Sequence, residues 1–415
     1  MEVIAEENLQ SRQGQLEQDS HSGAADLQER LHRLNLISNH PNLPRLPPDI
    51  IYSVADEFER TCTTAECRKI GCRMSLVCRE WREIGQSLVF RHVFLPSVDV
   101  YSPMVRRLVQ RSFFLVEHIR HIGIKHLTPT IPTATVLLPM FNSCFQLSRL
   151  TISTMPKQMS EIIKALVNST ARKSVKRIQL DYVLSGSLDD FDDRDFLKLG
   201  EINLLEVFSV TVPVDFIFLL PRRFPASQPL RTQGFYLRFS GKTQEEDYDA
   251  ATSSFLSLIE PRTLRHLFLS TPSIPPSAAK WLAHQASLKT LHLLNDHSLV
   301  SRTISNLVPV VNTLRLLRSL KIEATRLPCQ DEITNDILVF EPTMVELLHF
   351  LPTWITVVSL DAITTGGGYR AITDFLRARQ SGALCEFKIM GGKGERIVAR
   401  KVVKEGRSSW KVDQL

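Results

Sequence analysis

The pattern that decides the fold is clearest at residues 264–269, which read LRHLFL. Apolar side chains fill the first, fourth and sixth positions of this segment. Successive side chains of a β-strand point to opposite faces, so the fourth and sixth positions share one face and the fifth lies on the other. The segment therefore predicts a short strand with one buried face and one open face.

The same pattern recurs along most of the chain. Ten segments carry it, and residues 234–239 (GFYLRF) form an imperfect eleventh copy. The middle apolar residues of the copies are Val93, Ile122, Leu150, Ile178, Phe208, Leu237, Leu267, Leu291, Leu320, Val358 and Phe387. Their average spacing is about 29 residues, which is typical of a protein built from strand–helix repeats.

Helix-like stretches separate the predicted strands. The stretch that begins at Ser160 has a residue suited to capping a helix, and another begins with Pro342, which suits a first helical turn. One strand and one helix cannot bury their own apolar faces, so neighbouring repeats must stack. We therefore predict an α/β repeat solenoid over residues 93–390, with parallel inner strands and outer helices. A doubly wound sheet is the alternative, but no glycine-rich phosphate-binding turn follows any of the predicted strands.

Composition limits the classes of function. The 415 residues include 50 Lys and Arg against 44 Asp and Glu, a net charge of +6. This small excess does not indicate a nucleic-acid partner. The polar, acidic N-terminus does not resemble a signal peptide, and the longest uncharged run is interrupted by prolines, so we expect no membrane partner. The odd count of 7 cysteines favours a reducing compartment, the cytoplasm or the nucleus.

A second kind of segment precedes the repeats. Residues 43–92 contain two apolar stripes at helical spacing, one that begins at Ile50 and one that includes Trp81. Pro47 and Pro48 suit the start of the first helix. We predict a compact helical module here, with the polar residues 59–73 as a loop between its first two helices. Residues 1–42 are predicted to be a mostly disordered acidic arm with one short helix, and residues 391–415 a basic C-terminal cap that includes a final strand.

Three short motifs of the helical module resemble an F-box, as found in fungal-type F-box proteins. They are LPPDII (46–51), LVCREWR (76–82) and LVFRHV (88–93). The repeats resemble the leucine-rich repeats that often follow an F-box. They depart from that family because no Asn stands five residues after any middle apolar residue.

The resemblance implies a non-catalytic substrate receptor of a Skp–cullin–F-box ubiquitin ligase, monomeric apart from that complex. The module would bind a Skp-type adaptor, and through it a cullin, while the repeats hold a target protein. The adaptor-binding residues that the resemblance implies are Leu46, Pro47, Ile50, Ile51, Val54, Leu76, Val77 and Trp81. The alternative is a leucine-rich-repeat interaction scaffold that takes no part in ubiquitination.

Charged side chains gather at the positions between the apolar residues of each copy. Over eleven copies these positions hold eleven Lys or Arg and only two acids. They predict a basic surface for an acidic or phosphorylated target segment, with a solvated sheet face as the alternative. The candidate target-binding residues are Arg120, Arg149, Arg177, Tyr236, Arg238, Arg265, His292 and Lys321.

No motif predicts a metal, a cofactor or catalysis. Cys62, Cys67, Cys72 and Cys78 are spaced five, five and six residues apart, without the Cys-x-x-Cys pair of most zinc sites. The acidic run at residues 189–195 lacks the glycine of a calcium-binding loop. We found no nucleophile elbow and no His-Glu-x-x-His motif. The sequence thus predicts a binding protein and no enzyme.

Overall fold

The computed structural model describes most of the chain after residue 46. The described residues are 47–61, 64–77, 79–96, 98, 105–106, 108, 116–126, 134–183, 194–202, 205–219, 229–241, 245–295, 299–324, 345–360, 366–379, 382–390, 396–404 and 407–414. The predicted acidic arm, the adaptor-binding candidate Leu46 and most of the acidic run at 189–195 lie outside them.

One sheet runs through the whole repeat region, and its strands follow one another in sequence order. The first eleven strands pair in parallel. They are β1 (His92–Leu95), β2 (His121–His126), β3 (Arg149–Thr154), β4 (Arg177–Tyr182), β5 (Leu205–Pro213), β6 (Thr232–Ser240), β7 (His266–Ser270), β8 (Thr290–Asn295), β9 (Ser319–Ala324), β10 (Val357–Leu360) and β11 (Glu386–Met390). Parallel neighbours in sequence order are the topology of a solenoid, so the predicted repeat fold is confirmed.

Two further strands close the C-terminal end of the sheet. They are β12 (Arg396–Lys404) and β13 (Arg407–Gln414), and both pair antiparallel. The sequence predicted a strand near β12 but not the hairpin. The indole N–H of Trp410 donates to the carbonyl oxygen of Leu376 at 2.8 Å, which fixes the hairpin to the last helix. The hairpin therefore covers the final repeat, as a solenoid end requires.

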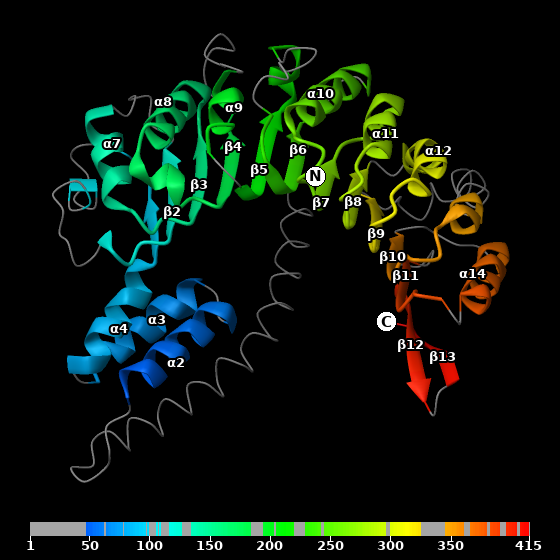
Figure 1. Ribbon diagram of the computed structural model, residues 1–415, viewed down its shortest axis with the longest axis horizontal. Helices are drawn as coiled ribbons and strands as arrows, with labels where there is room; N and C mark the ends of the chain where they lie inside the picture. The colour runs from blue at the N-terminus through cyan, green and yellow to red at the C-terminus, as the bar shows by residue number, and fades with distance from the viewer. Residues whose placement is uncertain are drawn as a thin grey trace, which may run out of the picture.

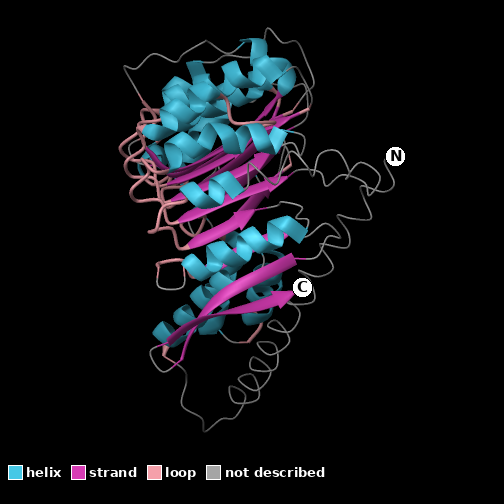
Figure 2. Cartoon of the chain, turned by 90° about the vertical axis from the view of Figure 1, so that its right-hand side faces the viewer, coloured by secondary structure: helices cyan, strands magenta, loops and turns pink. Residues whose placement is uncertain are grey.

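The helices lie on the outer side of the arc and the strands line its inner side (Figure 1). The strands lie side by side across the arc in the second view (Figure 2). The outer helices are α7 (Ala134–Ser143), α8 (Pro156–Val167), α9 (Arg194–Leu199), α10 (Glu245–Leu258), α11 (Pro276–Ala283), α12 (Val300–Val311) and α14 (Gly366–Ala378). No helix in the described ranges combines the length and apolar character needed to cross a bilayer.

Rows of apolar side chains from neighbouring strands form the core. Ile178, Phe208 and Phe235 are adjacent in register, and each is at most 1% exposed. The rings of Phe208 and Phe235 stack with centroids 5.8 Å apart. Because each row continues from one repeat to the next, the strands and helices enclose one continuous core.

The register of β6 corrects one prediction. Phe235, not Leu237, lies in line with Phe208 and with Leu267. The first position of this copy is therefore Thr232, a fully buried polar residue whose hydroxyl donates to the carbonyl oxygen of Gly234 at 2.8 Å. A shift of two residues leaves the same side chains facing the core, so alternation alone could not separate the two registers.

Polar side chains tie neighbouring repeats together at the carboxyl ends of the strands. The amide of Asn295 donates to the carbonyl oxygen of Thr271 on the preceding repeat at 2.9 Å. Asn295 stands four residues after Leu291 rather than five. A buried Asn thus joins these two repeats, although the position expected from the family holds none.

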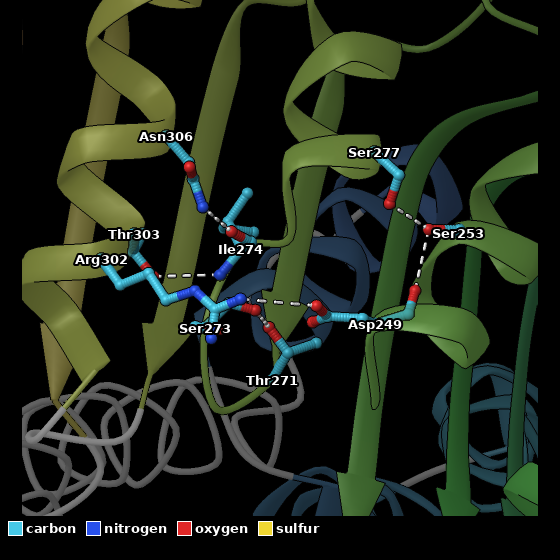
Figure 3. Close-up of polar contacts among 9 residues, drawn as sticks. All are labelled: Asp249, Ser253, Thr271, Ser273, Ile274, Ser277, Arg302, Thr303 and Asn306. Carbon is cyan, nitrogen blue, oxygen red and sulfur yellow. Dashed lines mark hydrogen bonds and ion pairs between the residues drawn. The ribbon is translucent and has the colours of Figure 1, made fainter. Parts of the chain in front are cut away.

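A second set of polar contacts joins the outer helices α10, α11 and α12 (Figure 3). Two side chains of α12 bind the backbone of Ile274. The hydroxyl of Thr303 accepts from the N–H of Ile274 at 3.0 Å, and the amide of Asn306 donates to the carbonyl oxygen of Ile274 at 2.8 Å. The hydroxyls of Ser253 on α10 and Ser277 on α11 lie 2.6 Å apart. The contacts of Thr303 and Asn306 satisfy the backbone polar groups of Ile274, which is fully buried.

The N-terminal module consists of the helices α2 (Pro48–Thr61), α3 (Thr64–Met74) and α4 (Arg79–Phe90). The predicted loop over residues 59–73 is wrong, because most of this stretch forms α3. Cys67, Ile70 and Met74 lie on one face of α3 and are buried. Apolar side chains at this spacing give a mostly polar segment one apolar face. Packing of that face against the other helices stabilises α3, although its sequence contains few apolar residues.

Candidate functional site

The helical module divides the predicted adaptor-binding residues into two groups. Ile51 and Trp81 are 1% and 6% exposed and belong to the core of the module. Trp81 was predicted to bind the adaptor, but its side chain packs into the core that α2, α3 and α4 form. An interior residue of this kind stabilises the module and offers no surface to a partner.

The second group retains exposed apolar surface. Ile50 is 47% exposed and Leu76 is 85% exposed, and Pro47 is also exposed. Val54 and Val77 are partly buried and pack against the rim of the module core. Leu76 and Val77 lie in the turn between α3 and α4 rather than on a helix. The candidate adaptor surface is therefore formed by α2 and this turn.

Polar contacts join the module to the first repeat. The buried guanidinium of Arg91 binds the carboxylate of Asp56 on α2 at 2.9 Å. Arg68 on α3 donates to the carbonyl oxygen of His92 in β1. Arg91 is one of the eleven basic residues that were predicted to form a basic surface, but its side chain is only 6% exposed. The module and the arc are therefore connected through side chains as well as through the backbone.

The open face of the sheet carries side chains in rows that cross the strands. The middle row, defined by the register, contains Phe94, Gly123, Thr151, Gln179, Ser209, Tyr236, Phe268, His292, Lys321, Ser359 and Lys388. Polar side chains occupy much of this row between β3 and β5, and aromatic rings occupy it at β6 and β7. The face therefore changes in chemistry from one part of the arc to the next.

Aromatic side chains gather in the middle row at β6 to β8. The rings of Tyr236 and Phe268 stack at 5.8 Å, and Phe268 meets His292 edge-on at 4.7 Å. The Nε2 atom of His292 lies 2.8 Å from a carboxylate oxygen of Glu323 on β9. Tyr236 is 38% exposed. We call Tyr236, Phe268 and His292 the aromatic platform.

A pair of histidines lies at the junction between the module and the arc. The Nδ1 atoms of His92 and His121 are 3.2 Å apart, and Nε2 of His121 is 3.1 Å from the hydroxyl of Thr151. Burial lowers the pKa of His121 to about 4, and the charges of Arg149 and His92 act in the same direction. His121 is therefore neutral at pH 7.

Acid should destabilise the protein through His121. The unfolded chain takes up the proton near pH 6.5 and the folded chain only near pH 4, so stability that is present above pH 6.5 is lost as the pH falls toward 4. We expect His121→Gln to lose less of its free energy of unfolding than the wild type between pH 7 and pH 4.5, as measured by urea denaturation. Replacement of the exposed, non-ionisable Asn312 by Gln should leave the wild-type dependence in place. Equal losses in wild type and His121→Gln would contradict this assignment.

The edge at which the parallel strands begin, here called the amino edge, is rich in basic residues. For β1 to β4 and β7 to β10, the carbonyl oxygen of the residue before the strand accepts two backbone N–H groups from the next repeat. The carbonyl oxygen of Arg265, for example, accepts from Lys289 at 2.7 Å and from Thr290 at 3.0 Å. Exposed basic side chains stand at or just after these positions in Arg120, Arg149, Lys176, Arg177, Arg265, Lys289 and Arg318.

The structure separates the predicted target-binding residues into three lines. Arg120, Arg149, Arg177 and Arg265 belong to the amino edge. Tyr236, His292 and Lys321 lie in the middle row, and Arg238 lies two residues further toward the carboxyl ends of the strands. The eight residues thus do not converge on one pocket. Arg149 and Arg177 are register partners on β3 and β4, and a second group lies on β6 to β9.

Two exposed basic residues of the amino edge escaped the sequence analysis. Arg262 and Arg315 each stand two residues before the first apolar residue of a copy, outside the positions that were counted. Their shared offset from Leu264 and Leu317 is the signal that could have found them. Asp56 and Arg68 also escaped it, because their partners are 35 and 24 residues away in sequence and follow no repeat.

The described cysteines do not form a metal site. The thiol of Cys67 is buried and donates to the carbonyl oxygen of Phe58 at 3.2 Å, while Cys72 is exposed. The side chains of Cys62 and Cys78 lie outside the described residues. Across the parts of the chain that the structure covers, no group of three His, Cys, Asp or Glu residues could hold an ion.

These features define an α/β repeat solenoid with a helical module at its N-terminal end. No known protein family and no curated protein matches the sequence. Among solved structures, the leucine-rich repeat-containing protein LegL7 from Legionella pneumophila is similar, with 13% sequence identity and a TM-score of 0.35. The match covers 74% of this chain and 92% of LegL7.

Proposed function

We propose that this chain is the substrate-binding subunit of a Skp–cullin–F-box ubiquitin ligase. One observation carries the proposal: a small helical module is joined to the first strand of an open-faced arc, yet keeps apolar side chains exposed. In this function the module binds the adaptor and the arc binds the target. The complex would act in the cytoplasm or the nucleus, where such ligases meet their targets.

The exposed side chains of the module give the adaptor an apolar surface to bury. Full burial of a side chain such as Ile50 or Leu76 contributes about 1.5–3 kcal/mol. Val54 and Val77 extend this surface and rest on the module core, so they are already held in place. An interface centred on such residues gains apolar burial without a large cost in ordering.

The arc supplies binding rather than bond chemistry. A receptor accelerates ubiquitin transfer by holding the target lysine close to the charged enzyme, which converts a bimolecular encounter into one within the complex. The contacts of Arg91 with Asp56 and of Arg68 with His92 support this function, because they limit movement between module and arc. No side chain of this chain is needed as a nucleophile or a general base.

Aspartate at the two most exposed module positions should remove adaptor binding. We expect the Ile50→Asp, Leu76→Asp variant to retain less than about one-tenth of the adaptor that co-purifies with the wild type, because both carboxylates would have to be desolvated at the interface. Phe145→Asp is the matched control, since Phe145 is 51% exposed on the arc.

The control should co-purify adaptor at the wild-type level. Equal recovery with the double variant would place the adaptor elsewhere on the chain. Absence of adaptor from the wild-type preparation would reject the receptor function and leave the interaction scaffold as the function of the arc.

A further inference from the structure

Five basic side chains cluster at the amino edge of β7, β8 and β9. Arg265, Lys289 and Arg318 occupy equivalent places on consecutive repeats. The backbone N–H of Lys289 donates to the carbonyl oxygen of Arg265 at 2.7 Å, and the backbone N–H of Arg318 donates to the carbonyl oxygen of Lys289 at 2.8 Å. Neighbouring strands are about 4.8 Å apart, so these residues form a closely spaced line. Arg262 and Arg315 lie in the turns just before it, and all five are exposed. We call these five residues the basic edge.

The basic edge differs in its counter-charges from the segment of the amino edge at β4 to β6. Glu206 binds both Lys176 and Arg177, at 3.2 and 3.4 Å, and Glu260 binds Arg231 at 2.9 Å. In the described part of the chain, no carboxylate lies within ion-pair distance of any of the five side chains of the basic edge. Their positive charges are therefore available to a negatively charged partner.

The surroundings of the basic edge respond to this charge. Burial lowers the pKa of His266, at the start of β7, and the charges of Lys289 and Arg265 lower it further. Two like charges about 5 Å apart repel each other by roughly 0.8 kcal/mol even in water. A bound anion would relieve this repulsion between neighbouring repeats, in addition to forming its own ion pairs.

The aromatic platform adjoins the basic edge on the same strands. His266 and Phe268 are two residues apart on β7, so both face the open side of the sheet. Tyr236 and His292 flank Phe268 on the neighbouring strands. A ligand that crosses β6 to β9 would thus meet basic side chains at one edge and aromatic rings about 10 Å further along the strands.

We propose that the basic edge and the aromatic platform together bind a short acidic peptide segment of the target protein. The acidic side chains of the peptide pair with Arg265, Lys289 and Arg318, and one apolar or aromatic side chain packs on Tyr236 and Phe268. The proposal names the class of target for the receptor function above and rests on that function.

A peptide fits this surface better than a nucleic acid does. The open face also carries two carboxylates. One is Glu323, which is bound to His292, and the other is Asp181 on β4. These carboxylates repel a nucleic acid, which bears a negative charge on every nucleotide, whereas a peptide can place its acidic residues at the basic edge alone. Paired charges would set the register of the peptide, and the aromatic contact would add apolar burial.

Charge reversal at three positions tests the proposal with the full-length chain. The probe is a fluorescein-labelled, glutamate-rich peptide with a central phenylalanine, followed by anisotropy. We expect Arg265→Glu, Lys289→Glu, Arg318→Glu to weaken binding at least about tenfold, and added NaCl to weaken wild-type binding. The control Lys157→Glu, Lys173→Glu, Lys280→Glu reverses three exposed lysines away from the basic edge, with the same change in net charge, and should bind as the wild type does.

A separate variant tests the aromatic platform. Tyr236→Ala should weaken binding of the phenylalanine peptide but not of a peptide with serine in its place. If charge reversal disturbs the fold, as judged by thermal unfolding, the neutral variant Arg265→Gln, Lys289→Gln, Arg318→Gln provides the same comparison.

Three outcomes would overturn the proposal: equal binding of a glutamine-rich peptide, equal weakening by the control triple, or tighter binding of polyuridine RNA than of the acidic peptide. Adaptor co-purification is measured on the same samples. The reversed variant should lose the peptide and keep the adaptor, whereas failure of the receptor function would remove adaptor from every sample and leave the peptide result unchanged.

Discussion

Replacing Gly85 with leucine should unfold the N-terminal helical module. Helices α3 and α4 cross where Gly71 and Gly85 face each other, and a Cβ atom on Gly85 would lie 2.5 Å from the carbonyl oxygen of Gly71 and 2.6 Å from the backbone nitrogen of Ser75. Backbone atoms in a packed helix pair cannot move aside as a flexible side chain can. We expect a cost of at least about 3 kcal/mol, a large share of the stability of so small a unit.

Hydrogen exchange resolved by peptide distinguishes this effect from a general loss of stability. Exchange over α2 to α4 should become fast while the strands of the arc keep their protection. Gly382→Ala is the matched control, because its Cβ would meet nothing nearer than 3.5 Å. Unchanged protection of α3 and α4 in Gly85→Leu would show that the two helices do not cross at these glycines.

Truncation of Phe208 to alanine should destabilise the centre of the arc. Its ring is fully buried on β5 and stacks on Phe235 of β6. Removal of such a side chain costs about 3–5 kcal/mol. Because each repeat contacts only its neighbours, the loss at β5 should also uncouple the two halves of the array. Urea unfolding should shift to lower denaturant and separate into two transitions.

The neighbouring residue provides the control for this prediction. Ser209 lies on the open face, so Ser209→Ala should change the free energy of unfolding by less than about 0.5 kcal/mol. The Phe208→Ala, Phe235→Ala double variant should lose about 0.5–1.5 kcal/mol less unfolding free energy than the sum of the two single losses. The reason is that each single variant already removes the stacking between the two rings, which the double variant can lose only once. Additive losses would contradict the register that aligns these two rings.

The repeat fold was predictable because its signal is local and repeated. Each copy of the LRHLFL pattern specifies one strand with a buried face, and the near-constant spacing leaves room for only one helix or loop between strands. The exception at β6 has a physical cause. Thr232 satisfies its hydroxyl within its own strand, so a polar residue could take a core position that the pattern reserves for an apolar one.

The helical module was less predictable because its packing depends on contacts between helices. The sequence of α3 is mostly polar, and its burial rests on Cys67, Ile70 and Met74 together with the close approach at Gly71. Trp81 shows the same limit: a family motif marks the residue, but only the fold decides whether it faces the core or a partner.

The candidate target site was predictable in composition but not in arrangement. The excess of basic residues between the apolar positions placed Arg265 correctly on the surface. Alternation alone could not divide the amino edge from the middle row, because a residue such as Arg265, which precedes a strand, has the parity of the core yet remains exposed. The pairing of Glu206 and Glu260 with other bases, which leaves the basic edge without carboxylates, depends on distances that no spacing rule gives.

The most direct test of the receptor function is a calorimetric titration of a purified Skp-type adaptor into the full-length chain. We predict saturable one-to-one binding with a dissociation constant below about 1 µM, a free energy of about −8 kcal/mol or more favourable. The Ile50→Asp, Leu76→Asp variant should remain folded but lose this binding. Absence of binding heat at adaptor concentrations about a hundredfold higher would contradict the receptor function.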